Sequence, residues 1–133
     1  KYYDVVTASP LNPGGKIKDL PLHRLFLSKS ISLIYKTISG SNINTFTCAF
    51  RAYRGNTLRN LDYKSDGFTC AAEILILLIL NNYRVKEVPS VLSNRKYGQS
   101  KMKILSTIID HLGLISRLIR IRLTSRTVVN EKN

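Results

Sequence analysis

The chain is poor in acidic residues. It has 8 Asp and Glu against 21 Lys and Arg, a formal net charge of +13 over 133 residues, and an isoelectric point near 10.1. A surplus of this size indicates a polyanionic partner, which is nucleic acid, an anionic membrane face or a phosphate-bearing substrate. Composition alone does not choose among the three.

Cysteine is also scarce. Cys48 and Cys70 stand far apart, without a CxxC pair and without a neighbouring His. This excludes the usual spacing of a zinc site and a framework of several disulfides. The pattern is typical of a reducing compartment, and we interpret both cysteines as small buried apolar residues.

Long hydrophobic runs are missing. The apolar run 74–80 is far shorter than the roughly 20 residues that a membrane-spanning helix needs, so we predict a buried core helix there. No secretory signal is visible. The chain opens at Lys1, without Met, in what reads as a strand, so we expect part of the domain to precede it.

Standard catalytic motifs are absent from the sequence as well. It has no Gly-rich phosphate loop, no HExxH, no GxSxG and no Asp-x-Asp pair. His23 and His111 are isolated, and we interpret each as an exposed or interfacial side chain. We therefore expect this chain to bind no metal ion by itself.

The hydrophobic pattern predicts one α/β domain in the order β-α-β-α-α-β-α. We expect strands at 2–8, 46–53 and 84–92. We expect helices at about 20–39, with Asp19 as N-cap and Gly40 as C-terminal stop, then at 57–61, 67–80 and 102–123, and a frayed tail at 124–133. Three strands are few for this much apolar helix, which again suggests that part of the sheet lies outside the chain.

The last predicted helix has two faces. Apolar residues share one side, and polar or charged residues share the other: Ile104, Leu105, Ile108, Ile109, Leu112, Ile115 and Ile119 against Lys103, Ser106, Asp110, Arg117 and Arg120. Further arginines follow at Arg122 and Arg126, where a core helix needs none. The segment 104–123 is therefore predicted to lie in a membrane interface, with packing on the sheet as the alternative.

Two basic constellations could bind phosphate. Arg24 and Ser28 lie one turn apart near a helix N-terminus, where an Arg fork, a hydroxyl and the helix dipole suit an oxyanion. The alternative is an ordinary solvated helix face. The second is the loop Arg95-Lys96-Tyr97-Gly98-Gln99-Ser100-Lys101, where Gly98 would let the backbone approach a ligand. The alternative there is a basic surface loop.

Four stretches in this order carry a family resemblance. They are Ala8-Ser9-Pro10 leading to Pro13-Gly14-Gly15, Arg24-Leu25-Phe26-Leu27-Ser28, Thr47-Cys48-Ala49-Phe50-Arg51-Ala52-Tyr53-Arg54, and Glu87-Val88-Pro89 leading to the loop at 95–101. A Gly67-Phe68 followed by Glu73 also matches. Together they resemble family-two glycosyltransferases of the dolichyl-phosphate mannose synthase and polyprenyl-phosphate sugar transferase type.

The resemblance implies that residues 1–103 are the C-terminal, acceptor-side part of a GT-A-like nucleotide-diphospho-sugar transferase fold. The missing half would hold the nucleotide and, through Asp-x-Asp, a divalent cation such as Mg or Mn. Arg24 and Ser28 would bind the lipid phosphate. Arg95 would lie at the active site with Gly98, Ser100 and Lys101 close by, and Arg24 and Arg95 are the residues expected to matter most for catalysis. Weaker candidates are Ser9, Gly14, Gly15, Thr47, Phe50, Arg51 and Glu73, and for Glu73 we favour a structural role.

The implied reaction transfers a mannose- or glucose-like sugar, with inversion, from a GDP- or UDP-linked donor to a polyprenyl or dolichyl phosphate. The protein would work peripherally on the cytoplasmic face of a membrane, and this piece would be inactive alone. Departures from the family pattern are Ser9-Pro10 for Ser-Arg, Thr47-Cys48-Ala49-Phe50 for Thr-Ser-Gly-Phe, and Thr45 for an Asp. They bear on the sugar and the lipid more than on the fold.

Two other functions remain open. One is a nucleic-acid-binding domain, which the charge favours. Against it, the sequence has no known binding motif, and we expect its basic residues not to be interleaved with exposed aromatics, so we expect no nucleic-acid partner. The other is a non-catalytic, membrane-associated relative of a transferase.

Overall fold

The computed structural model describes residues 2–59, 61–93 and 103–130, and for 124–130 the backbone only. The described elements confirm the α/β class. They are β1 (Val5–Ser9), β2 (Lys16–Lys18), α1 (Leu22–Ser39), β3 (Arg51–Tyr53), α2 (Gly67–Leu80), β4 (Val85–Pro89), β5 (Val91–Ser93) and α3 (Ile104–Asn130).

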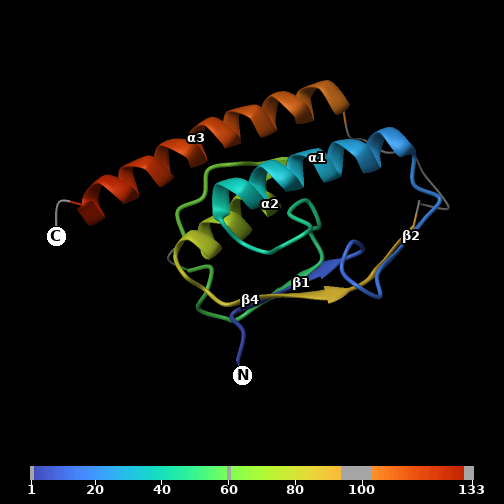
Figure 1. Cartoon of the computed structure of the whole chain (residues 1–133), viewed down its shortest axis with the longest axis horizontal. Helices are drawn as coiled ribbons and strands as arrows, with labels where there is room; N and C mark the ends of the chain where they lie inside the picture. The colour runs from blue at the N-terminus through green and yellow to red at the C-terminus, as the bar shows by residue number, and fades with distance from the viewer. Residues whose placement is uncertain (1, 60, 94–102, 131–133) are drawn as a thin grey trace.

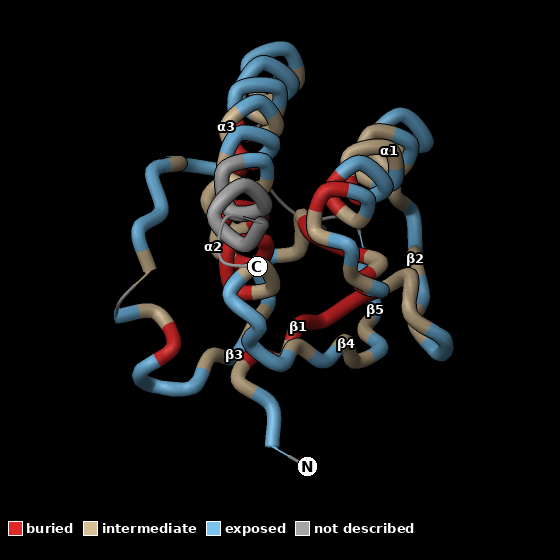
Figure 2. Tube along the Cα trace, turned by 60° about the vertical axis from the view of Figure 1, so that its left-hand side comes forward, coloured by how far each residue is buried: buried red, intermediate tan, exposed pale blue. Residues whose placement is uncertain are grey.

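The described strands form two small sheets. In the larger one the order is β3-β1-β4, with β3 antiparallel and β4 parallel to the central β1, while β2 and β5 form a parallel pair. The helices α1 and α2 lie over one face of the larger sheet, and α3 lies across them on the far side (Figure 1). Buried residues concentrate on β1, on α2 and on the inward sides of α1 and α3 (Figure 2).

The start of α1 differs from the prediction. Asp19 does not cap it: this residue has a φ of 53°, and the helix begins at Leu22 with Pro21 in the N-cap position and no side-chain cap. The predicted C-terminal stop is confirmed, because Gly40 adopts a φ of 65° and its N–H bonds to the Lys36 carbonyl.

The predicted strand 46–53 is mostly wrong, since only Arg51–Tyr53 forms a strand. The guanidinium of Arg51 donates to the carbonyl of Phe46 and so folds the preceding segment back on itself. Two isolated turns, Thr57 N–H to Arg54 and Leu61 N–H to Leu58, stand where a short helix was expected at 57–61. The predicted strand 84–92 divides into β4 and β5, which belong to different sheets.

The helix α3 packs differently from the prediction. Leu114 and Leu118, which the predicted apolar side did not include, are fully buried against α1 and α2. Several residues of the predicted side are instead exposed: Leu105, Ile108, Ile109, Leu112 and Ile119. The helix also extends beyond residue 123, since no Gly or Pro follows to end it. None of the described helices has the length and hydropathy to cross a bilayer.

Two of the α3 arginines have structural partners, which corrects the inference that a packed helix would need none. Arg117 forms an ion pair with buried Glu73, with 3.1 Å between Nη2 and Oε1. Arg122 donates from Nη1 to the carbonyls of Thr37 and Ile38 in the last turn of α1. A cation there neutralises the negative end of the helix dipole. These contacts fix α3 to both other helices.

A partly buried Tyr–His contact also joins α1 to α3. The phenol oxygen of Tyr35 lies 2.7 Å from Nδ1 of His111. Burial lowers the pKa of His111 below its ordinary value of 6.5, and the nearby Asp110 opposes this in part. Burial, with the charge of Glu73, raises the pKa of Tyr35, so its phenol stays protonated. Both groups are therefore neutral where the helices meet.

The free energy of unfolding is expected to fall as the pH drops below 6.5, because the unfolded chain then binds a proton that burial keeps off His111 in the folded protein. The loss should level off below the lowered pKa of the folded state. Urea unfolding over a series of pH values measures it. His111→Gln should remove this component and His23→Gln, at an exposed position, should keep it. An unchanged pH profile in His111→Gln would contradict the assignment.

Candidate functional site

A cavity of about 420 Å³ opens between α1, the end of β1 and the β2–β5 pair. This volume lies within the range of small-ligand sites. Three residues predicted from the sequence line it, namely Ser28, Thr47 and Phe50, and the Ser28 and Thr47 hydroxyl oxygens lie 2.9 Å apart. The rest of the lining is mostly apolar: Ala8, Pro10, Leu11, Ile17, Leu20, Leu25, Thr45, Cys48, Ser90, Val91 and Leu92. A cavity of this chemistry suits a lipid end with one polar group.

Buried hydrogen bonds hold the wall of this cavity. Both carboxylate oxygens of Glu87, on β4, accept bonds from the segment 44–45: Oε1 from the backbone N–H groups of Asn44 and Thr45, and Oε2 from the Asn44 side chain. The Ser9 and Thr45 hydroxyl oxygens lie 2.7 Å apart and are fully or nearly buried. Ser9 therefore supports the wall from behind rather than lining the cavity.

Gly14 and Gly15 shape the turn that follows β1. Gly14 has a φ of 88°, which side chains rarely adopt. At Gly15 an added Cβ would lie 2.5 Å from the Pro10 carbonyl oxygen, so no side chain fits without moving the turn. Pro10 and Leu11, earlier in the same turn, line the cavity. Both glycines are therefore needed for the backbone of this turn, and no contact with a ligand is required to explain them.

Arg24 lies one helical turn before Ser28, beside the cavity but outside its lining. Its Nε is inaccessible to water and has no hydrogen-bond acceptor within the described ranges. The first turn of α1 has no acidic residue and no side-chain cap, so the positive end of its dipole is not neutralised locally. A guanidinium and free helix N–H groups together favour an anion at this end of α1.

Arg51 makes contacts within the fold. Its guanidinium and Nε donate to the Thr7 hydroxyl at 3.0 Å and to the carbonyls of Phe46 and Ala71. Burial lowers the pKa of Arg51 from its ordinary value, although three acceptors satisfy the group. The side chain ties β3 to β1, to the turn at Phe46 and to α2, which is a structural use of this candidate residue.

Glu73 is buried midway along α2, with 1% of its surface exposed. It accepts the backbone N–H groups of Lys64 and Ser65 and pairs with Arg117, which also donates to the Ser65 hydroxyl at 2.8 Å. These contacts agree with the structural role that the sequence favoured. They hold the segment before α2 against α3.

Arg95, Gly98, Ser100 and Lys101 lie outside the described residues, so their expected place at the active site stays a prediction. Across the described part of the chain, no group of His, Cys, Asp and Glu is arranged to hold a metal ion.

One argument against nucleic acid is weakened by the structure. Arg54 lies 5.8 Å from the ring centre of Tyr2, and Lys86 lies 5.3 Å from that of Tyr3, at an end of the sheet far from the cavity. Both rings are exposed, so basic and aromatic side chains are interleaved there after all. The sequence does not show this arrangement, because Tyr2 and Tyr3 are far from Arg54 and Lys86 in the chain. The pairing of β1 with β3 and β4 brings them together.

Sequence reasoning missed most of the apolar lining. Ile17 and Leu92 face each other in the β2–β5 pair, and both lie on the cavity. The hydrophobic pattern assigned residues 16–18 to no element, because three residues between turn signals carry too little pattern to predict a strand. They become a strand only by pairing with residues 91–93, which the folded chain brings alongside.

Known proteins resemble most of this chain. A polyprenol monophosphomannose synthase from Mycolicibacterium smegmatis is 32% identical over 102 residues, which is 74% of this chain and 38% of the relative. An undecaprenyl-phosphate mannosyltransferase from Micrococcus luteus is 33% identical over 102 residues, 74% of this chain and 42% of the relative. No family model matches the chain.

The ordered motifs resembled glycosyltransferases that act on polyprenyl phosphates, and both relatives are transferases of this class. The chain belongs to the polyprenyl-phosphate sugar transferases. It spans about two fifths of the length of the curated relatives it matches.

Proposed function

We propose that this chain forms the acceptor side of a transferase that moves a sugar, most simply mannose, from a nucleotide sugar to a polyprenyl phosphate. The observation that carries the proposal is the arrangement of Arg24 and Ser28 on the uncapped start of α1, beside a largely apolar cavity. The names of both relatives, which act on polyprenol or undecaprenyl phosphate, support the same acceptor class.

The proposed reaction is an in-line attack by a lipid phosphate oxygen on the anomeric carbon. The bond to the donor's diphosphate breaks as the new one forms, so the configuration inverts. A phosphate monoester is already ionised at neutral pH, so no strong general base is required. The residues of this chain would instead position the acceptor: Arg24 through its charge and Ser28 through its hydroxyl. Both would hold an anion against its electrostatic repulsion from the donor.

The donor of the sugar would bind outside the described residues of this chain. A GDP- or UDP-linked sugar and a divalent cation would be held by parts of the relatives that this chain does not span, within a GT-A-like fold. Arg95 and the loop around it would act where donor and acceptor meet. No described residue of this chain is assigned to the cation.

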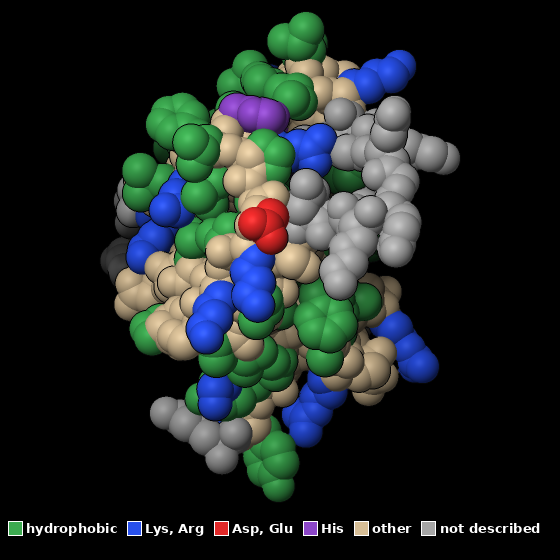
Figure 3. All heavy atoms as spheres, turned by 90° about the vertical axis from the view of Figure 1, so that its right-hand side faces the viewer, with side chains coloured by type: hydrophobic (Ala, Val, Ile, Leu, Met, Phe, Trp, Pro, Cys, Tyr) green, Lys and Arg blue, Asp and Glu red, His purple; other side chains and the backbone are tan. Residues whose placement is uncertain are grey.

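The proposed membrane contact uses the first turns of α1 and α3. Large apolar side chains are exposed there: Leu22, Phe26, Leu105, Ile108, Ile109 and Leu112. Figure 3 views this end of the molecule and shows hydrophobic side chains gathering in its upper part, with Lys and Arg beside and below them. Apolar groups flanked by cations suit the cytoplasmic surface of an anionic membrane, where the protein would bind peripherally.

Vesicle binding tests the acceptor assignment directly. The chain is expected to bind phosphatidylcholine vesicles containing polyprenyl phosphate more tightly than vesicles containing the uncharged polyprenol. Ser28→Ala should weaken this preference by about tenfold, because a hydrogen bond to a charged group is lost. Ser116→Ala, an exposed position on α3, is the matched control. Equal binding to both vesicles by the unaltered chain would refute the acceptor role.

A further inference from the structure

A second cavity, of about 310 Å³, lies beside the first along α1. Its lining residues are Leu11, Lys29, Ser32, Leu33, Lys36 and Asn44. Leu11 belongs to both cavities, and Ser32 follows Ser28 by one helical turn. The two cavities are thus neighbours that share Leu11.

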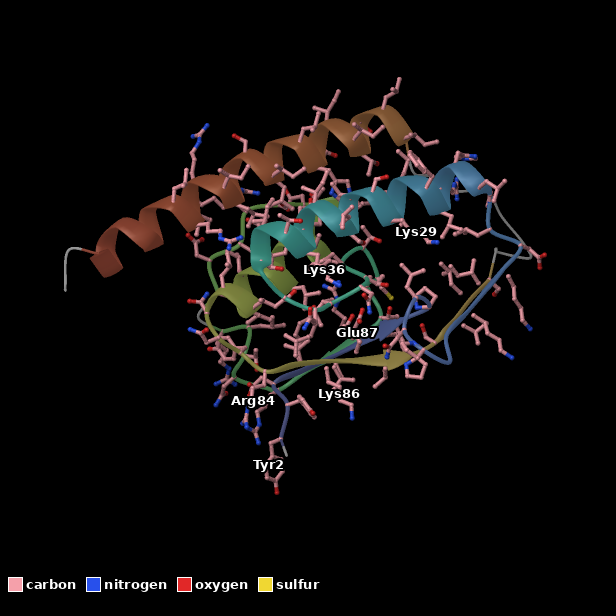
Figure 4. The ribbon with its side chains drawn as sticks, viewed as in Figure 1. Tyr2, Lys29, Lys36, Arg84, Lys86 and Glu87 are labelled. Atoms are coloured by element: carbon pink, nitrogen blue, oxygen red, sulfur yellow. The ribbon has the colours of Figure 1, made fainter. Side chains whose placement is uncertain are left out.

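The lysines and the serine share one face of α1. They stand at intervals of three and four residues, so the two lysines leave the helix about 10 Å apart along its axis with Ser32 between them. Figure 4 shows Lys29 and Lys36 leaving α1 on its lower side, toward the sheet, with Glu87 below Lys36. Two flexible ammonium groups can therefore reach one group held between them.

Little in the described protein neutralises these lysines. Neither forms an ion pair with a described residue, and the hydrogen bond from Lys36 is a long one, 3.5 Å from Nζ to Oδ1 of Asn44. The nearby carboxylate of Glu87 is occupied by N–H groups of Asn44 and Thr45. Two cations against one carboxylate leave a positive surplus at the cavity.

Ser32 adds a hydroxyl donor between the cations. It is nearly buried, and its oxygen accepts the backbone N–H of Phe46 at 3.3 Å. Within the described residues its own proton has no acceptor, so it is available to a ligand in the cavity. An ammonium on each side and a hydroxyl between them offer three separate donors, which a phosphate group with several charged oxygens can accept together.

We propose that Lys29, Lys36 and Ser32 form a second phosphate-binding site, distinct from the acceptor cavity at Ser28. Its ligand is a phosphate group, either free or carried by a lipid headgroup; the exposed Leu33 at the cavity would contact the apolar part of such a lipid. This site goes beyond the proposed sugar transfer and does not depend on it.

The test is an NMR titration of the 133-residue chain, first with inorganic phosphate and then with phosphatidylcholine vesicles with and without phosphatidylglycerol. Amide shifts are expected at Ser32, Leu33 and Asn44. The double variant Lys29→Gln/Lys36→Gln should weaken binding about tenfold or more, since charge-assisted contacts are lost. The control Lys64→Gln/Lys86→Gln removes the same charge at exposed positions elsewhere and should bind like the unaltered chain.

Shifts with inorganic phosphate that only the first double variant loses would support a site for free phosphate. Shifts that require phosphatidylglycerol, and are lost in the same variant, would support a lipid headgroup. Equal weakening in both double variants, or no shifts at the cavity with either probe, would overturn the proposal. Binding of polyprenyl phosphate through Ser28 is measured separately, so either proposal can fail while the other stands.

Discussion

Replacing Arg24 by alanine is expected to lower turnover at least about tenfold, because it removes a charge-assisted contact of about 1.5–3 kcal/mol to the acceptor phosphate. The assay is mannosyl transfer to polyprenyl phosphate by a chimera of the Mycolicibacterium smegmatis relative in which this chain replaces the segment it matches. The structure adds a reason to the sequence argument. The Nε of Arg24 is inaccessible and has no acceptor within the described ranges, and the first turn of α1 holds no acidic residue.

Arg24→Lys separates charge from geometry in the same assay. It keeps the positive charge but loses the planar fork, so its turnover should lie between that of the unaltered chimera and that of Arg24→Ala. Arg59→Ala, an exposed arginine outside the cavities, is the control for loss of charge alone. Each chimera is first checked for donor nucleotide binding, which reports that it is folded. Unaltered turnover in Arg24→Ala would remove this residue from the acceptor site. The sequence makes the same prediction for Arg95→Ala.

Replacing Glu73 by alanine is expected to lower the free energy of unfolding by about 3 kcal/mol, the lower end of the range for removing one partner of a buried ion pair, because the side chain of Arg117 is 32% exposed. The change would leave Arg117 without its carboxylate and the N–H groups of Lys64 and Ser65 without an acceptor. Urea unfolding followed by circular dichroism measures the effect. The loss should be largest here because Glu73 is the buried point at which α2, α3 and the segment before α2 meet.

Two further variants make this prediction specific. Asp62→Asn removes a negative charge at an exposed position, and its stability should match the unaltered chain within about 0.5 kcal/mol. Glu73→Met with Arg117→Leu replaces both charges by apolar side chains and should recover much of the loss. If Glu73→Ala unfolds at the same urea concentration as Asp62→Asn, the ion pair contributes nothing to the packing of α3.

The helices were the most predictable part of this fold. Both Gly40 at the end of α1 and the apolar run of α2 are local signals, and the structure agrees with them closely. The strands were predicted less well because short strands depend on their partners. The segment around Phe46 looks extended in sequence. Arg51, only five residues on, and Glu87, from elsewhere in the chain, bend it into a wall of the cavity.

The amphipathic pattern of α3 shows the limit of such signals most clearly. Its apolar residues surround more of the helix than one face needs, so periodicity could not tell the buried side from the exposed one. Leu114 and Leu118 are buried because they face the surface that α1 and α2 present. Two arginines of α3 hold the helix in this orientation: Arg117 pairs with Glu73, and Arg122 binds the carbonyl end of α1. The exposed apolar residues that remain are those now proposed to meet the membrane.

The sequence by itself determined the family, the α/β class, the basic charge and the pairing of Arg24 with Ser28, since all of these rest on composition or on motifs close together in the chain. Only the tertiary structure decided which hydroxyls, glycines and apolar side chains share the cavity, which cations are occupied by ion pairs, and that Lys29 and Lys36 stand beside a second cavity. The physical reason is that such choices depend on contacts between residues that the chain separates by tens of positions and that folding alone brings within a few ångströms.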